Sequence, residues 1–218
     1  MPTVYRVRMR NMPAKAILIR KQELARTLQS VSPHPDPRAY LEQYTIPADL
    51  AADILFLACY VHEDIDGKFV LDLGTGTGRL AIGASILGAE YVVGIDIDRL
   101  ALNVASESCK QLNLEIDWLL GEVGSLRGQV DTILMNPPFG TKQPHADVKF
   151  IQIALKLGKT IYTIHKASTR QFLQRWLREH GADNTRVIST DMEIPHQFPF
   201  HTRKRDYVAV DVLRIKSP

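Results

Sequence analysis

The sequence predicts an α/β fold, a doubly wound and mostly parallel sheet of seven strands whose last strand runs antiparallel. From residue 68 onward, short runs rich in Val, Ile and Leu alternate with helical stretches, a pattern typical of parallel strands covered by helices on both faces. The last two runs have no helical pattern between them, so the final strand is expected to turn back on its neighbour. No apolar run approaches the roughly 20 residues that cross a bilayer.

Each element of this region follows from its local pattern. Strands are expected where apolar residues form short runs bounded by glycine, proline or charged residues, at residues 68–74, 91–97, 116–122, 131–136, 160–165, 185–191 and 206–215. Helices are expected where apolar residues recur every three or four positions, at residues 47–61, 78–88, 99–112, 148–157 and 168–181.

The N-terminal segment has its own composition. Residues 1–39 contain eight Lys or Arg and two acidic residues, a net charge of +6, whereas the whole chain carries +3 and the remainder therefore −3. A basic segment of this kind indicates contact with a polyanion, or else a solvated helix face.

Three patterns divide this segment. "TVYRVRMR" alternates apolar residues with arginine, as a short strand or a disordered arm does. "AILIRKQELARTLQSV" has the apolar spacing of a helix, and the alternate prolines of "SPHPDPR" predict a stiff, extended spacer. We therefore expect a basic N-terminal extension at 1–39, made of arm, helix and spacer, ahead of a main domain at 40–218.

The cysteines and histidines of the sequence indicate whether disulfide bonds or a metal site are expected. Cys59 and Cys109 lie in apolar helical patterns, and the seven histidines are scattered without metal-ligand spacing. Neither a disulfide framework nor a metal site is expected, and a cytoplasmic location fits. The N-terminus lacks the apolar core and cleavage site of a signal peptide.

A glycine loop follows the first strand of the alternating region. "VLDLGTGTGRLA" places Gly74, Gly76 and Gly78 between a strand and a helix, where the backbone can approach a ligand and the helix N-terminus offers free N–H groups. Asp96 ends the next strand, 22 residues after Gly74, where an acid can accept both hydroxyl hydrogens of a ribose. The loop predicts a nucleoside-containing cofactor; a glycine-rich turn without a ligand is the alternative.

The glycine spacing narrows the choice of cofactor. A dinucleotide site has G-x-G-x-x-G, whereas this loop has G-x-G-x-G, with Asp72 two residues before it. That acid would repel a pyrophosphate but suits a cationic sulfonium or amino group, so a nicotinamide dehydrogenase is disfavoured. Glu122, at the end of the third strand, is placed to meet an adenine or ribose edge, or is simply an exposed acid. This order of features resembles the class I (Rossmann-like) S-adenosylmethionine-dependent methyltransferases.

The fourth expected strand runs into Asn136, Pro137, Pro138 and Phe139, at the same edge of the sheet. An exocyclic amine on a planar base is a weak nucleophile because its lone pair is delocalised into the ring. The Asn136 side-chain oxygen and the Pro137 carbonyl can accept its two N–H bonds and turn the lone pair toward a methyl donor. Phe139 offers a face on which an extruded base can stack. The alternative is an ordinary Asn-Pro turn with a core aromatic.

Longer strings narrow the resemblance further. "LEQY" (Leu41–Tyr44), "DLGTGTG", "GIDID", "ILMNPPFGTK" and "HKASTR" together resemble the methyltransferase-like protein 5 family of small-subunit ribosomal RNA adenine-N6 methyltransferases, which has archaeal relatives. The resemblance spans Arg20 to Ile215, and "QPHADVKF" after the motif departs from the family's more glycine-rich loop.

This resemblance implies S-adenosylmethionine as the cofactor and residues 40–218 as the methyltransferase catalytic domain. It implies cofactor contacts from Gln43, Thr45, Gly74, Thr77, Asp96 and Glu122, and a catalytic motif made of Asn136, Pro137, Pro138 and Phe139. It also implies a small zinc-binding activator protein that covers an exposed sheet edge or apolar patch.

Basic residues near the same edge are candidates for phosphate contacts. Lys166 and Arg170 follow the strand at 160–165, and Arg203, Lys204 and Arg205 precede the last strand, where a solvated hairpin is the alternative. We therefore expect methylation of adenine N6 in RNA, most simply small-subunit ribosomal RNA. Two alternatives stay open: a protein glutamine-N5 methyltransferase, and a non-catalytic RNA-binding subunit that retains a cofactor fold.

Overall fold

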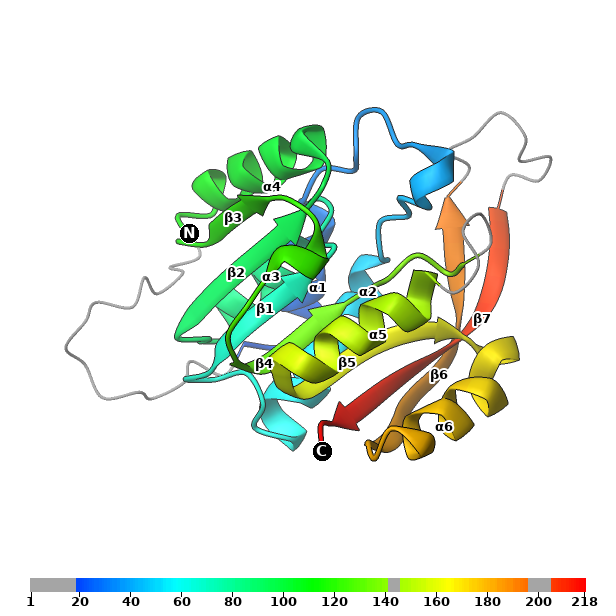
Figure 1. Ribbon diagram of the computed structural model, residues 1–218. Coiled ribbons are helices and arrows are strands. Elements are labelled where there is room, and N and C mark those ends of the chain that lie inside the picture. Colours follow the sequence, from blue (N-terminus) through cyan, green and yellow to red (C-terminus); the bar gives the residue numbers. More distant parts are fainter. Residues whose placement is uncertain (1–18, 141–145, 196–204) are drawn as a thin grey trace.

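Helices cover both faces of one seven-stranded sheet in the protein (Figure 1). The computed structural model describes residues 19–140, 146–195 and 205–218. The strands are β1 (Phe69–Leu73), β2 (Tyr91–Asp96), β3 (Asp117–Leu120), β4 (Val130–Met135), β5 (Gly158–Lys166), β6 (Asp183–Pro195) and β7 (Arg205–Lys216). The α-helices are α1 (Lys21–Gln29), α2 (Ala48–Phe56), α3 (Arg79–Ile86), α4 (Arg99–Gln111), α5 (Ala146–Leu157) and α6 (Arg170–Glu179).

The strand order is β3-β2-β1-β4-β5-β7-β6. Strands β1 to β5 pair in parallel, and β7 pairs antiparallel with both β5 and β6. The predicted sheet, including its antiparallel last strand, is confirmed. The order reverses between β1 and β4, and ligands of such sheets bind at the carboxyl ends of the strands beside that reversal.

Alternate residues of the central strands face opposite helix layers. Val70 and Leu134 pack with residues of α1, α2 and α3, whereas their neighbours Leu71 and Ile133 pack with α5 and α6. All four side chains are at most 4% exposed. In Figure 1, α5 and α6 lie on the near face of the sheet and α1 and α2 behind it. Burial on both faces explains why these strands read as continuous apolar runs.

The described part of the N-terminal segment joins this core. Leu24 and Leu28 of α1 are fully buried in the same cluster as α2 and α3. The Arg79 guanidinium, at the start of α3, donates to the carbonyl oxygens of Val31 at 3.1 Å and Ile46 at 2.5 Å. The division at residue 39 stays a prediction, and the arm "TVYRVRMR" lies outside the described residues.

Two elements differ from their sequence patterns, one in the type of its last helical turn and one in its extent. The helix expected at 47–61 is α2 followed by a π-helical turn, η2 (Leu57–Val61), in which the His62 N–H reaches the Leu57 carbonyl at 3.1 Å. The strand expected at 185–191 runs from Asp183 to Pro195 because it pairs with β7 along nearly its whole length, around a bulge between Arg186 and Ile188. None of the described helices is long and apolar enough to span a membrane.

Candidate active site

The carboxyl ends of β1, β2 and β4 open onto a cavity of about 460 Å³. Its walls also include residues 40–46, residues 122–124 and the first turns of α5. Ten predicted site residues line it: Gln43, Thr45, Asp72, Gly74, Gly76, Thr77, Asp96, Glu122, Asn136 and Pro138. Gly78, Pro137 and Phe139 are not part of its wall. Ten of the thirteen predicted catalytic and cofactor-binding residues therefore meet in one cavity at the expected edge of the sheet.

The glycine loop is held against the end of β2. The N–H groups of Gly74 and Thr75 both donate to the Ile95 carbonyl, at 2.9 and 3.0 Å, and Gly74 and Gly76 have positive φ angles of 68° and 55°. Phe150 of α5 covers the loop so closely that a Cβ atom on Gly74 would lie 3.1 Å from its ring. Glycine is therefore needed here for both conformation and space.

Asp96 is tied to the same loop. Its Oδ2 accepts the Gly76 N–H at 2.8 Å, and its Oδ1 accepts the Asp98 N–H at 2.9 Å. Burial raises the pKa of the Asp96 carboxyl, although these backbone N–H groups act in the opposite direction. A fixed carboxylate that lines the cavity with lone pairs to spare suits a pair of ribose hydroxyls.

Asp72 presents an unpaired oxygen. The side chain is 1% exposed, and its Oδ2 accepts the Thr75 hydroxyl at 2.7 Å and the Ala81 N–H at 3.0 Å. The Oδ1 atom is buried without a hydrogen-bond partner. Burial, with a smaller contribution from the Asp96 charge, raises the pKa of this carboxyl to about 7. A cationic ligand group at Oδ1 would remove the unfavourable burial of an ionised acid.

Asn136 also presents an unpaired oxygen. Its Nδ2 donates to the Tyr44 carbonyl at 3.2 Å, which fixes the orientation of the side-chain amide. Its Oδ1 is buried without a partner and belongs to a residue of the cavity wall. The acceptor that the amine mechanism requires is therefore available where the sequence predicted it.

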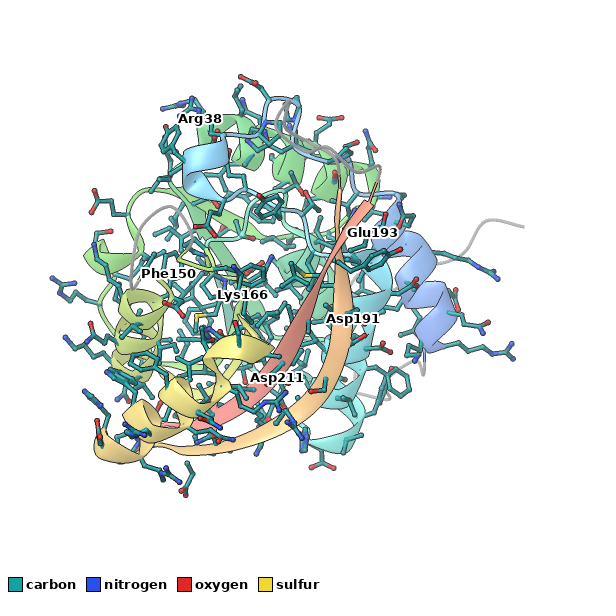
Figure 2. All side chains as sticks on the ribbon, turned by 90° about the vertical axis from the view of Figure 1, so that its right-hand side faces the viewer. Arg38, Phe150, Lys166, Asp191, Glu193 and Asp211 are labelled. Carbon is teal, nitrogen blue, oxygen red and sulfur yellow. The ribbon has the colours of Figure 1, made fainter. Side chains whose placement is uncertain are left out.

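The rest of the tetrapeptide is anchored beside the cavity. The Phe139 N–H donates to Glu42 Oε2 at 2.8 Å, and the Phe139 ring packs against the core shared with α1 to α3. The Lys166 ammonium lies 5.7 Å from the centroid of that ring, within the range of a cation–π interaction. In Figure 2, Lys166 and Phe150 lie at about the same height, between Arg38 above and Asp211 below.

Unpaired polar atoms are concentrated in this cavity. Across the described residues, the buried side-chain polar atoms without a hydrogen-bond partner are His34 Nε2, Asp72 Oδ1, Arg79 Nε and Asn136 Oδ1, and all four residues line the cavity wall. Of these atoms, His34 Nε2 lies 3.3 Å from Asp98 Oδ2, so it is the other three that point to a ligand. Buried polar atoms are normally paired, so this concentration indicates a site for a polar ligand. Sequence reasoning missed His34 and Arg79, because a proline spacer and a helix start gave no signal for them.

Gln43 holds the rim of the cavity together. Its Oε1 accepts the Arg38 N–H at 2.7 Å, and its Nε2 donates to Asp98 Oδ2 at 2.9 Å. Asp98 in turn caps α4 by accepting the Leu100 N–H at 2.8 Å. Burial acts to raise the pKa of Asp98, but the bonds from Gln43 and the α4 backbone outweigh it and hold that pKa below its usual range.

The predicted phosphate contacts fall into three groups. Lys166 lies beside Phe139, as described above. Arg170 is only partly exposed and forms an ion pair with the buried Asp211. Arg203 and Lys204 lie outside the described residues, as does the side chain of Arg205. His165, the neighbour of Lys166, is 1% exposed and its Nε2 lies 2.9 Å from the Thr163 hydroxyl, so it is part of the packed interior.

Comparison with known proteins extends over nearly the whole chain. Residues 55–136 match the family described as ribosomal protein L11 methyltransferase (PrmA). The rRNA N(6)-adenosine-methyltransferase Mettl5 of Drosophila melanogaster is 35% identical over 206 residues, which cover 91% of this chain and 97% of the fly protein. An uncharacterised protein of Methanocaldococcus jannaschii is 39% identical over 212 residues, covering 92% and 95%.

A solved structure agrees with the fold. A crystal structure from Pyrococcus horikoshii, described provisionally as an RNA methyltransferase, is 37% identical and superimposes with a TM-score of 0.85. The match covers 92% of this chain and 99% of that one. The predicted class I methyltransferase fold is therefore confirmed.

Proposed function

This chain belongs to the family of METTL5 rRNA N6-adenosine methyltransferases and their archaeal relatives, and we propose that it methylates N6 of an adenosine in small-subunit ribosomal RNA. The observation that carries the proposal is the Asn136 amide. Its nitrogen is bound to the Tyr44 carbonyl, so its unpaired Oδ1 is left to accept a hydrogen bond in the cavity. An adenine amino group is a donor of the kind that this acceptor requires.

S-adenosylmethionine is the cofactor that the cavity fits. It supplies an electrophilic methyl group on a cationic sulfonium. The buried Asp72 Oδ1 suits its positive charges, and Asp96 suits its ribose hydroxyls. Gln43, Thr45, Gly74, Gly76, Thr77 and Glu122, all in the wall of the same cavity, are proposed to complete the site, and Gly78 keeps the loop close to its neighbours.

The chain's own contribution to the reaction is positioning. Asn136 Oδ1 and the Pro137 carbonyl each accept one N–H of the adenine amine, so that the lone pair is withdrawn from the ring and directed at the methyl group. Pro137 and Pro138 hold the backbone because their φ angles are fixed. Phe139 stacks on the base once it has left its helix or loop. No nucleophilic side chain is needed.

Basic groups around the site are proposed to bind the RNA backbone. Lys166 lies beside the tetrapeptide, through its contact with Phe139. The cluster of Arg203, Lys204 and Arg205 is proposed to add further phosphate contacts. For Arg170, which the sequence also suggested as a phosphate contact, the ion pair with Asp211 favours a structural role. The basic residues before position 39 are proposed to add further phosphate contacts.

A small zinc-binding activator protein is proposed as a partner. In the described part of the chain β3 ends the sheet, and Leu119 and Leu120 on it are 41% and 48% exposed. An uncovered strand edge with apolar side chains favours pairing with another chain.

The buried, unbridged Cys59 and Cys109 accord with the proposed cytoplasmic location.

Methyl transfer from radiolabelled S-adenosylmethionine tests the proposal. The protein is incubated with separate pools of ribosomal RNA, transfer RNA, DNA and protein, with and without a candidate activator. We expect label in small-subunit ribosomal RNA that digests to N6-methyladenosine, and its loss in Asn136→Ala. Asn103→Ala, on the exposed side of α4, is the matched control and should leave the label in place.

Two other outcomes would change the assignment. Label in protein that digests to methylglutamine would support the glutamine-N5 alternative and leave the cofactor assignment intact. Cofactor binding without label in any pool, even with activator, would support a non-catalytic RNA-binding subunit. The rRNA adenosine relatives match this chain almost from end to end, which favours the first outcome.

A further inference from the structure

Three consecutive residues bind three different parts of the site. Glu42 accepts the Phe139 N–H at 2.8 Å, across 97 positions of sequence. Gln43 donates to Asp98, the residue that caps α4, and the Tyr44 carbonyl accepts the Asn136 amide N–H at 3.2 Å. Both ends of the catalytic tetrapeptide are thus bound by one short segment outside the sheet.

The backbone of this segment is held in an unusual conformation. Glu42 has a φ angle of 51°, in the left-handed region that side chains other than glycine rarely adopt. The Tyr44 N–H donates to the Glu42 carbonyl at 2.8 Å, so the contacts to Phe139 and Asn136 are fixed relative to each other by a tight turn. Backbone strain of this kind persists only where the surroundings fix it, and it gathers at functional sites.

The Glu42 side chain is placed to accept a hydrogen bond from the catalytic tetrapeptide. It is 7% exposed, and a buried carboxylate is stable only when it is hydrogen-bonded. The Phe139 N–H follows two prolines that have no N–H of their own, so it is the first backbone donor after Asn136. Anchoring this donor fixes the path of the chain through Pro137 and Pro138.

We propose that Glu42 is a positioning residue for methyl transfer. Through its hydrogen bond to the Phe139 N–H it sets the direction of the Pro137 carbonyl and the Phe139 ring, while Tyr44 sets which atom of the Asn136 amide faces the substrate. The effect acts through the tetrapeptide and not through the cofactor. The expected effect of Glu42 on the transfer rate rests on the proposed function. The anchoring of the Phe139 N–H by Glu42 does not.

Amide hydrogen exchange at Phe139, followed by NMR, tests the anchoring without any activity. Glu42→Met keeps the length of the side chain without a strong acceptor, and we expect the Phe139 amide to exchange about tenfold faster or more. Glu42→Gln keeps an acceptor oxygen and should retain most of the protection. Unchanged exchange at Phe139 in Glu42→Met would overturn the proposal.

Glu63 supplies a matched control. It is an exposed glutamate with the same left-handed backbone, at a φ angle of 55°. Glu63→Met should leave both the Phe139 exchange and the transfer rate unchanged. If it reproduced the Glu42→Met effects, those effects would come from general destabilisation and the proposal would fail.

Single-turnover kinetics test the consequence for the reaction. We expect Glu42→Met to slow transfer by about 10- to 100-fold, as misplacement of reacting groups does, with the cofactor Kd changed less than about threefold, and Glu42→Gln to restore most of the rate. A matching loss of cofactor affinity would overturn the positioning role. If the unmodified protein methylated no RNA, the proposed function would fail, while the exchange result would still decide the anchoring.

Discussion

The guanidinium of Arg170 donates two hydrogen bonds to the carboxylate of Asp211, at 2.5 and 2.8 Å. Asp211 is 2% exposed and also accepts a bond from the Ser189 hydroxyl. Arg170 begins α6 and Asp211 lies on β7, so the pair joins a helix to the sheet. Arg170 is therefore engaged in a structural ion pair that Lys166 does not share, although the sequence suggested that both residues contact phosphates.

Lys166→Gln and Arg170→Gln should therefore differ in their effects. We expect Lys166→Gln to weaken RNA binding and to reduce the slope of log affinity against log salt by about 1, because one phosphate contact is lost. Arg170→Gln should mainly lower thermal stability, because it leaves a buried carboxylate with one partner fewer. Fluorescence anisotropy over a salt series and thermal unfolding measure the two effects.

The stability loss in Arg170→Gln should depend on pH. Burial acts to raise the pKa of Asp211, but the bonds from Arg170 and Ser189 outweigh it and hold the pKa below its usual range. An acid with a lowered pKa stabilises the fold above its unfolded-state pKa, and this contribution is lost as the pH falls through the lowered value. The two proteins should thus differ most near neutral pH and converge in acid. An equal difference at every pH would contradict this account.

Asn136→Asp tests the amide orientation at the centre of the site. The change keeps the shape of the side chain but replaces the N–H donor, so an oxygen would face the Tyr44 carbonyl. We expect a loss of about 100- to 1,000-fold in the single-turnover rate, with the cofactor Kd nearly unchanged. Asn103→Asp is the control on exposed surface. A rate near that of the parent protein would show that the bond to Tyr44 is dispensable.

Asp72 should make cofactor binding pH-dependent. Its pKa is raised to about 7 by burial, so the carboxyl of the free protein takes up a proton as the pH falls below neutrality. A cationic ligand prefers the ionised form, and its Kd should therefore rise by about tenfold between pH 8 and pH 6. Isothermal titration calorimetry measures the trend.

Asp72→Asn is the control for that titration. It should remove most of the pH dependence, and what remains reports the ligand's own ionisable groups. The same pKa has the opposite effect on the stability of the ligand-free protein. An acid whose pKa is raised by folding makes the fold less stable as the pH rises from about 4 to 7. Asp72→Asn should therefore unfold at a higher temperature than the parent protein at pH 8. A lower unfolding temperature there would contradict the burial of an unpaired charge.

Gly78→Ala should be strongly destabilising. A Cβ atom at this position would lie 2.6 Å from Cη2 of Trp118 and 2.9 Å from Cβ of Ala105, in a backbone with a φ angle of +84°. Steric overlap and the left-handed conformation together should lower the free energy of unfolding by about 2 to 4 kcal/mol. Chemical denaturation measures the change.

Gly67→Ala isolates the steric part of that effect. Gly67 has a φ angle of +67° but no atom within 4 Å of its Cβ position. Its replacement should therefore cost about 1 to 2 kcal/mol, from conformation alone. Equal costs at the two positions would mean that Trp118 moves aside freely.

The fold and much of the site could be predicted because their signals are local. Strand, glycine loop and helix follow one another within residues 69–86, and the parallel order then places Asp96 and Asn136 at the same edge without any knowledge of packing. Strand limits were predicted less well where pairing decides them, as in β6, which β7 extends at both ends.

The remaining site residues depend on contacts that no local pattern encodes. Glu42 and Tyr44 meet the tetrapeptide across more than 90 positions. His34 reaches the cavity from a proline-rich stretch, and Arg79 joins Val31 to Ile46. The bond from Arg79 to Val31 requires the chain just after α1 to lie against α3, which the spacing of α1 alone did not predict.

The position of β7 has a consequence for how the protein is made. Of the seven strands of the sheet this one is synthesised last, yet it lies inside the sheet, between β5 and β6. Until residues 205–216 emerge, β5 has one unpaired edge and β6 has no strand to pair with. Folding that proceeds from the N-terminus during synthesis must therefore stop one strand short. The nascent chain passes through a stage with an open apolar edge, which closes only when β7 pairs with β5 and β6.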